Sequence, residues 1–293
     1  MSPSLRPRTA ASLVLAASVL ALRPGPAPAR PDDSVRVVGG RPAADGRYPF
    51  MASLQRTGAS GASAHFCGGS LVDRAWILTA AHCVHDEATG TFRIVVGATR
   101  LSAGEGEVRA AAEIRIDPDY DGDATHGADI AVVRLSAPVD DVAPLEPVRP
   151  AERAEWTAGA RATVIGWGVT LEAGRVASDR LRAAGLAIQP DSVMSAPDGY
   201  GDSFLPSDMV GAGPVEGGPD ACYGDSGGPL VIGRGSTLRQ VGIVSFGRGC
   251  GRHPGVYSRL GEGRVRAFLD RQQRAWRGRA PGPGGAATAS TFR

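Results

Sequence analysis

Short apolar runs separated by Gly, Pro and Asp recur along most of this chain. Five lie in the first half, at residues 51–54, 70–72, 94–96, 114–116 and 130–135. Five more follow the Pro-rich crossing 142–150, at residues 161–167, 186–188, 229–232, 241–246 and 255–260. Runs this short, with turn residues between them, are typical of antiparallel strands in a barrel or a sandwich. The pattern predicts two all-β halves of similar size, and ligand clefts tend to lie at such a junction.

The end of the chain has a different pattern. Residues 262–276 have helical spacing, with Val265, Phe268 and Leu269 on one face. Residues 278–293 are mostly Ala, Gly and Pro with almost no large apolar side chains, which is typical of a disordered tail. We therefore expect the folded domain to end near residue 277.

The start of the chain has the features of a secretory signal. Arg6 and Arg8 precede the uncharged segment 9–22, and small residues occupy positions 27–29. The apolar segment is shorter than the ~20 residues that a membrane-spanning helix needs. We expect a signal peptide at 1–29, removed on secretion to the extracellular space.

Charge and cysteine content narrow the class of protein. The net charge is +2, and residues 37–293 hold 27 Arg against 28 acidic residues, so we expect no nucleic-acid or membrane partner. Four cysteines in a secreted chain predict two disulfides, with three possible connectivities. A zinc site at Cys67, His82 and Cys83 is the weaker interpretation because no Cys-x-x-Cys pair accompanies it. We expect no metal and no cofactor.

One stretch carries a candidate nucleophile. Residues 220–230 read Asp-Ala-Cys-Tyr-Gly-Asp-Ser-Gly-Gly-Pro-Leu, so that Ser226 stands among glycines that can aim backbone N–H groups at one point. A Gly-x-Ser-x-Gly motif alone also fits a simple turn. An α/β-hydrolase would need an acid and then a histidine after the serine. His253 is the one histidine after Ser226, and no acid lies between them, which excludes that order.

Two more motifs identify the family. Thr-Ala-Ala-His-Cys at 79–83 follows an apolar run, and Asp129 opens another. In the order His82, Asp129, Ser226, these motifs resemble a trypsin-like member of the chymotrypsin family of serine endopeptidases over residues 37–276. The resemblance implies two six-stranded antiparallel β-barrels with a C-terminal helix, a catalytic cleft between them, and a monomer.

The resemblance also implies the chemistry. Ser226 would attack the scissile carbonyl, His82 would take its proton, and Asp129 would orient the imidazole. The N–H groups of Gly224 and Ser226 would hold the oxyanion. The implied disulfides pair Cys67 with Cys83 and Cys222 with Cys250.

Specificity is implied by residues around the nucleophile. Asp220 would form the floor of the primary pocket and select Arg or Lys, since a carboxylate there attracts a guanidinium. Gly247 and Gly255 would leave the pocket walls open, and Ser245 begins a segment that would pair with an extended substrate strand. The expected partners are protein or peptide substrates with Arg or Lys, and protein protease inhibitors.

The same resemblance implies a zymogen. Residues 30–36 would be a propeptide, cleaved after Arg36 by a trypsin-like activator. The α-amino group of Val37 would then turn inward and pair with Asp225, because a buried carboxylate without a partner is costly.

Some features depart from the family or leave alternatives open. Loop 189–218 lacks the cysteines of a disulfide that the resembling enzymes often carry there, so we expect it to be more mobile. Glu105 and Glu107 lie where some relatives bind calcium, but we interpret them as ordinary loop residues. The other four histidines are interpreted as surface or loop residues: His65, His85, His126 and His253. Alternative functions are a non-enzymatic binding protein on a protease fold, or a protease with another primary preference.

Overall fold

The structure is a computed structural model that describes residues 39–174 and 176–277. The predicted signal peptide, propeptide and tail lie outside the described residues, as do Arg36 and Val37.

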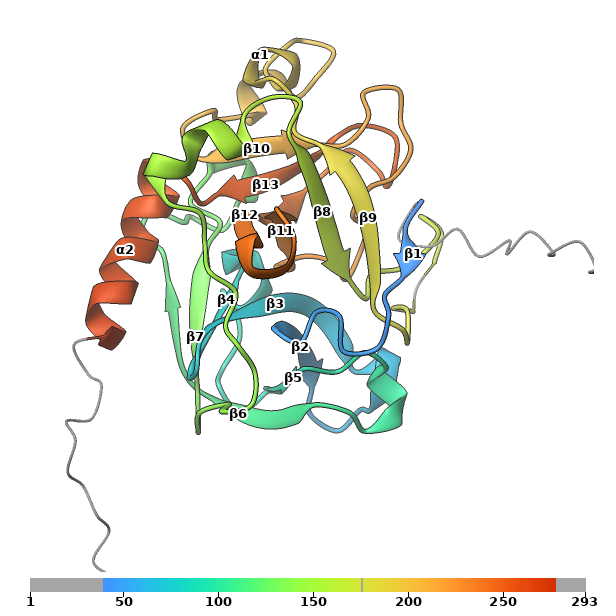
Figure 1. The fold of residues 1–293 in the computed structure, drawn as a ribbon, viewed down its shortest axis with the longest axis vertical. Coiled ribbons are helices and arrows are strands. Elements are labelled where there is room, and N and C mark those ends of the chain that lie inside the picture. The colour runs from blue at the N-terminus through green and yellow to red at the C-terminus, as the bar shows by residue number, and fades with distance from the viewer. Residues whose placement is uncertain (1–38, 175, 278–293) are drawn as a thin grey trace, which may run out of the picture. The chain divides into compact units, whose positions relative to one another are not determined.

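The first half of the chain forms a closed antiparallel barrel with the strand order β2-β3-β4-β7-β6-β5 (Figure 1). Its apolar runs supply a continuous interior in which Leu54, Ile77 and Ile94 are fully buried. The strands are β2 (Met51–Arg56), β3 (His65–Asp73), β4 (Trp76–Thr79), β5 (Phe92–Val96), β6 (Glu107–Ile116) and β7 (Ala131–Leu135).

The second half forms a seven-stranded antiparallel sheet with the order β1-β9-β8-β11-β12-β13-β10. An isolated bridge between Ile188 and Ala212 joins β9 to β10 and closes six of these strands into a second barrel, with β1 added at its side. The strands are β1 (Arg41–Pro42), β8 (Arg161–Gly166), β9 (Arg182–Ala187), β10 (Met209–Ala212), β11 (Pro229–Ile232), β12 (Arg239–Phe246) and β13 (Gly255–Arg259). The all-β, two-barrel prediction is confirmed.

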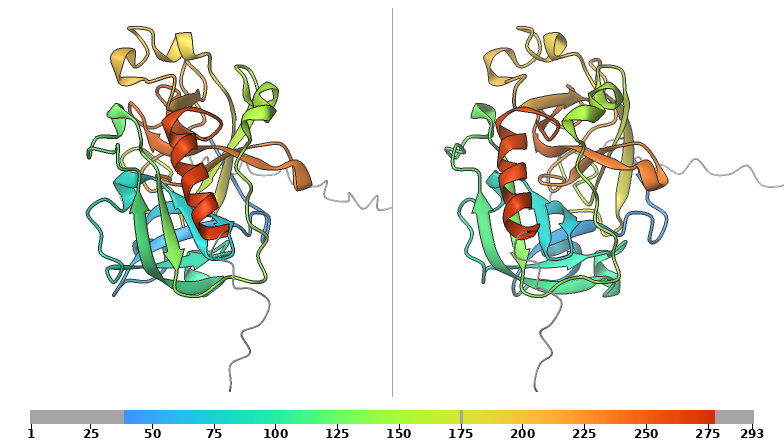
Figure 2. Two further views of the ribbon diagram at one scale, coloured as in Figure 1. Left: turned by 90° about the vertical axis from the view of Figure 1, so that its left-hand side faces the viewer. Right: turned by 60° about the vertical axis from the view of Figure 1, so that its left-hand side comes forward.

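Two α-helices accompany the sheets, α1 (Asp191–Met194) and α2 (Gly263–Arg277). The apolar face of α2 is buried as predicted, and its Trp276 stacks on Trp76 of β4 with the ring centroids 5.2 Å apart. The closing helix therefore runs from the second barrel back onto the first (Figure 2). In the described part of the chain, no helix combines the length and the hydrophobicity needed to span a membrane. Short 3₁₀ helices are η1 (Gly61–Ser63), η2 (Ala81–Cys83), η3 (Leu101–Ala103), η4 (Ala124–His126), η5 (Pro150–Trp156), η6 (Gly201–Ser203) and η7 (Gly235–Thr237).

Loop 189–218 has a small core of its own. Met194 of α1 packs directly over Gly211, where an added Cβ would lie 2.3 Å from the Met194 sulfur. Apolar packing thus anchors this loop in a chain that has no disulfide there. The core residues are Met194, Tyr200, Phe204, Met209 and Val256.

The two barrels meet along β3 and share one hydrophobic core. The Gly68 N–H of β3 donates to the Ser226 carbonyl at 2.7 Å, and the buried Ser70 hydroxyl donates to Gln240 of β12 at 2.7 Å. These bonds place the loop before β11 against the first barrel.

Candidate active site

Strand register brings His82 and Asp129 together. Thr79 of β4 pairs with Ala131 of β7, so the residues just after β4 and just before β7 emerge at the same end of the barrel. His82 lies in η2, which follows β4, and Asp129 lies two residues before Ala131. Two residues 47 positions apart in sequence thus become neighbours.

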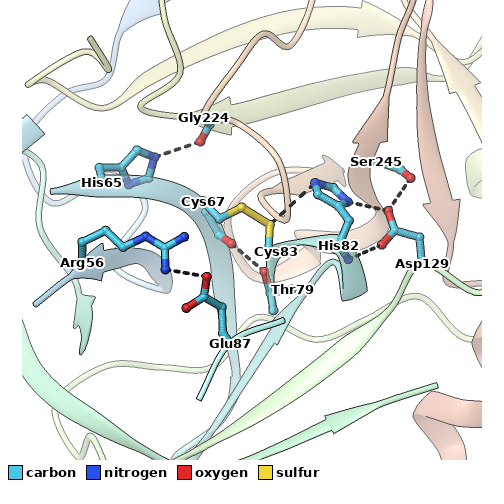
Figure 3. The surroundings of a disulfide bond; sticks show 11 residues. Arg56, His65, Cys67, Thr79, His82, Cys83, Glu87, Asp129, Gly224 and Ser245 are labelled. Atoms are coloured by element: carbon cyan, nitrogen blue, oxygen red, sulfur yellow. Dashed lines mark hydrogen bonds and ion pairs between the residues drawn. A yellow bond between two sulfur atoms is a disulfide. The ribbon is translucent and has the colours of Figure 1, made fainter. Parts of the chain in front are cut away.

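Asp129 makes two hydrogen bonds to His82. Its carboxylate accepts the His82 backbone N–H and the ring Nδ1–H, both at 2.9 Å, and the Ser245 hydroxyl at 2.5 Å (Figure 3). Burial alone would raise the pKa of Asp129, but the bond and charge of His82 and the bond from Ser245 lower it. Burial works to lower the pKa of His82, and Asp129 outweighs it, so that this pKa is raised. With Nδ1–H donated to the carboxylate, the neutral ring keeps its lone pair on Nε2.

The turn that aims Asp129 is strained. Ala128 has φ 54°, and it is the one non-glycine with a positive φ in the ranges 39–174 and 176–277. Such a conformation costs an L-residue about 1–2 kcal/mol. Its methyl group packs in a small cluster with Ala81 and Tyr120, which holds the turn against η2.

Ser226 lies just before β11 of the second barrel, and its loop packs against the segment that leads to His82. Its neighbour Gly227 has φ 79°, and an added Cβ there would lie 2.2 Å from the Thr79 hydroxyl and 3.2 Å from the Ala80 nitrogen. Only glycine allows the serine loop to approach the segment before His82 so closely. Among the described residues the Ser226 hydroxyl makes no hydrogen bond, and hydrogen bonds between catalytic groups are often long before substrate binds.

The loop before Ser226 is held by a buried acid. Asp225 is fully buried, and its carboxylate accepts the N–H groups of Gly168 at 2.7 Å and Cys222 at 2.9 Å. Burial raises its pKa to about 6, against the lowering effect of those two bonds. No cationic side chain in the described residues forms an ion pair with Asp225.

His65 is a buried residue of β3, so our interpretation of it as a surface or loop residue was wrong. It lies in β3 with 8% of its surface exposed, and its Nδ1 accepts the Ser53 hydroxyl at 2.7 Å. Its Nε2–H donates to the Gly224 carbonyl at 2.8 Å (Figure 3). Burial lowers its pKa to about 4, although the bond to Gly224 acts to raise it, so the ring is neutral. A neutral histidine thus orients the peptide unit after Gly224. No local alternation marks this position in the sequence, because β3 is buried on both faces from Cys67 to Leu71.

A cavity of about 240 Å³ opens beside Ser226 and ends at Asp220. Asp220 is 2% exposed, and its carboxylate accepts the N–H groups of Ala221 at 2.8 Å and Gly251 at 3.0 Å. Burial raises its pKa to about 7, and these two bonds offset that only in part. The carboxylate has no ion-pair partner in the described part of the chain, and a cation entering the cavity would supply one.

Two glycines line the walls of this cavity, Gly247 and Gly255. A Cβ on Gly255 would lie 2.8 Å from the Asp220 carboxylate, so a side chain there would block the floor. A Cβ on Gly247 would lie in ordinary van der Waals contact, 3.5 Å from the Gly249 carbonyl oxygen and 3.8 Å from the Tyr200 hydroxyl, so crowding at the Cβ does not require glycine there. Ser245 connects this cavity to Asp129, because it lines the cavity and its hydroxyl donates to the Asp129 carboxylate.

The cysteines pair as the resemblance implies, Cys67 with Cys83 and Cys222 with Cys250. The first disulfide ties β3 to η2 beside His82, and the second closes the rim of the cavity. Although Cys67, His82 and Cys83 lie together, disulfide sulfurs are poor metal ligands, so this is no metal centre. Glu105, one of the two acidic residues at the position where some relatives bind calcium, accepts the N–H groups of Thr99 and Arg100, at 2.8 and 2.9 Å.

Comparisons with known proteins agree with this geometry. The family model described as Trypsin matches residues 37–263. A trypsin from Saccharopolyspora erythraea is 37% identical, over 77% of this chain and 93% of that protein. Trypsin epsilon from Drosophila erecta is 38% identical, over 76% of this chain and 82% of that protein. Transmembrane protease serine 5 from Homo sapiens is 36% identical over 86% of this chain, which spans about half (54%) of that protein.

The family model matches most of the chain, and the chain covers 93% and 82% of the two trypsins. The chain belongs to the trypsin family of serine endopeptidases, hydrolases that act on protein substrates.

Proposed function

We propose that this protein is a secreted endopeptidase, made as a zymogen, that cleaves after Arg or Lys through an acyl-enzyme. The observation that carries the specificity is the buried Asp220 carboxylate, which closes the far end of a cavity whose mouth is at Ser226. A guanidinium or ammonium at that point would make charge-assisted hydrogen bonds, and Arg could make two in parallel.

The chemical roles follow from the hydrogen bonds. His82 Nε2 takes the Ser226 proton as the oxygen attacks the carbonyl, and returns it to the leaving amine. Asp129 holds the Nδ1–H tautomer and stabilises the imidazolium that forms. Water then attacks the acyl-enzyme by the same route, which frees Ser226.

The oxyanion is stabilised by the backbone of the serine loop. We assign the donors to the N–H groups of Gly224 and Ser226, since the Tyr223 carbonyl, which shares a peptide unit with the Gly224 N–H and points the opposite way, is held by the Val169 N–H at 2.7 Å. Donors of this kind typically contribute ~2.7–4 kcal/mol each to transition-state stabilisation.

Asp225 supports the proposed activation step. A fully buried carboxylate that accepts only two N–H groups lacks a cation in the described residues. The α-amino group of Val37, freed by cleavage after Arg36, would provide it. Two disulfides and the predicted signal peptide support secretion, because disulfides persist in oxidising compartments.

The direct test is the cleavage profile of protein processed to begin at Val37. We expect turnover of peptides ending in Arg or Lys, no turnover by Ser226→Ala, and an inactive precursor for Arg36→Gln. A preference for Phe or Leu would reject the proposed specificity while leaving the serine chemistry in place. Absence of labelling by an active-site serine reagent would reject the chemistry.

A further inference from the structure

Arg248 stands at the rim of the cavity in a fixed position. It directly follows the segment 245–247 that lines the cavity, and its side chain is exposed. Its guanidinium lies over the ring of Tyr200, 5.1 Å from the centroid, and donates to the Gly199 carbonyl. Its backbone N–H donates to the Tyr200 hydroxyl at 3.1 Å. These contacts leave the outer edge of the guanidinium facing solvent.

The support under Arg248 is rigid. Tyr200 is 4% exposed, and its hydroxyl donates to the Pro254 carbonyl at 2.8 Å. Its ring meets Phe246 edge to face, with centroids 5.7 Å apart. A side chain already held against a buried ring such as that of Tyr200 loses little rotamer freedom when it binds a partner.

Arg248 also carries charge that its surroundings do not neutralise. The nearby rim residue Arg252 is paired with Glu172, by contacts of 3.1 and 2.6 Å. No carboxylate in residues 39–174 and 176–277 forms an ion pair with Arg248. One rim arginine is therefore compensated, and the other is available to a ligand.

We propose that Arg248 selects substrates with an acidic residue three or four positions before the cleaved bond. This rests on the proposed function, because a substrate Arg in the cavity sets the register. The resemblance implies that a substrate strand pairs with 245–247, and such a strand advances about 3.3 Å per residue. Its residues before the bond pass Gly247 and then reach the exposed guanidinium, which matches a carboxylate in charge and geometry.

The test uses three peptides that end in Arg and differ only at the third and fourth positions before the bond: Ala-Ala, Glu-Glu and Arg-Arg. We expect kcat/KM of the processed enzyme to be about threefold to tenfold higher for Glu-Glu than for Ala-Ala, through KM, and lower for Arg-Arg. Arg248→Gln should remove this difference and Arg248→Glu should invert it. The matched control is Arg74→Gln, which removes an exposed arginine in the β3–β4 turn.

The Ala-Ala peptide separates this inference from the proposed function. Its equal cleavage by the wild type and by Arg248→Gln shows that the variant is folded and the cavity works. If the wild type then cleaves Glu-Glu and Ala-Ala equally, or if Arg248→Gln keeps the preference, Arg248 does not select acids. If the wild type cleaves no Arg-ended peptide, the Arg specificity and the inference that rests on it both fail.

Discussion

Asp129 and His82 shift each other's pKa in the direction that catalysis needs. The raised pKa of His82 means that the ring becomes the neutral base only above its ordinary pKa of 6.5. We expect kcat/KM of the processed enzyme to rise with pH through that raised value. Asp129→Asn should lower kcat by about 10⁴-fold, the loss typical of this change in Ser-His-Asp triads, and move the acidic limb of the pH profile to lower pH. An unmoved limb would contradict the assigned coupling.

Asp220 gives a prediction about ligand binding. Its pKa of about 7 means that the empty cavity holds a neutral acid below pH 7 and a carboxylate above it. A small aromatic amidine should therefore bind the processed enzyme more tightly as pH rises from 5 to 7, by up to tenfold per unit, and reach a plateau above pH 7. Isothermal titration at several pH values measures this, and Asp220→Asn should bind weakly without the pH dependence.

Among the elements, α1 packs on β10 through Met194, which belongs to the small apolar core of loop 189–218. Met194→Ala should lower the free energy of unfolding by about 2–4 kcal/mol, because it empties the space over Gly211. Leu171→Ala is the matched control: with 66% of its surface exposed, Leu171 should contribute less than about 0.5 kcal/mol. Urea unfolding followed by fluorescence compares them. Equal stability of the two variants would show that the loop core does not anchor this region.

At the scale of the whole molecule, the proposed processing at Arg36 would link the stability of the fold to the ionisation of Asp225. Its folded pKa of about 6 lies above the unfolded value near 3.9, so in the precursor its contribution is present at low pH and is lost as pH rises from about 4 to 6. For this fully buried group the loss is on the order of 3 kcal/mol. Pairing with the Val37 ammonium should depress that pKa and reverse the sign, so the contribution is then lost as pH falls.

Thermal unfolding of the precursor and the processed form between pH 4 and 7 tests this coupling. We expect the processed form to gain stability relative to the precursor as pH rises, and Asp225→Asn should abolish the difference. Parallel curves for the two forms would rule out the ion pair. Above pH 7 the pairing should weaken again as the ammonium deprotonates through its raised pKa, so activity should fall at alkaline pH.

Much of the fold could be predicted from local patterns in the sequence. Apolar runs such as 229–232 and 241–246 coincide with β11 and most of β12, and the amphipathic segment 262–276 coincides with α2 within one residue at each end. Local patterns missed β10, whose Gly and Ala do not stand out among turn residues. They also missed the inward side chain of His65, because burial of a polar residue depends on partners that lie far away in sequence.

The amino-acid sequence alone determined the β class, the family and which side chains have the chemistry of a hydrolase, because these depend on residue identity and spacing within short segments. Only the tertiary structure decided the burial, the pKa values and the neighbours of those side chains. Burial raises the pKa values of Asp220 and Asp225. Strand register places Asp129 beside His82. The ring of Tyr200 holds Arg248 at the rim of the cavity. Desolvation and register are sums over distant segments, so no local stretch of the chain contains them.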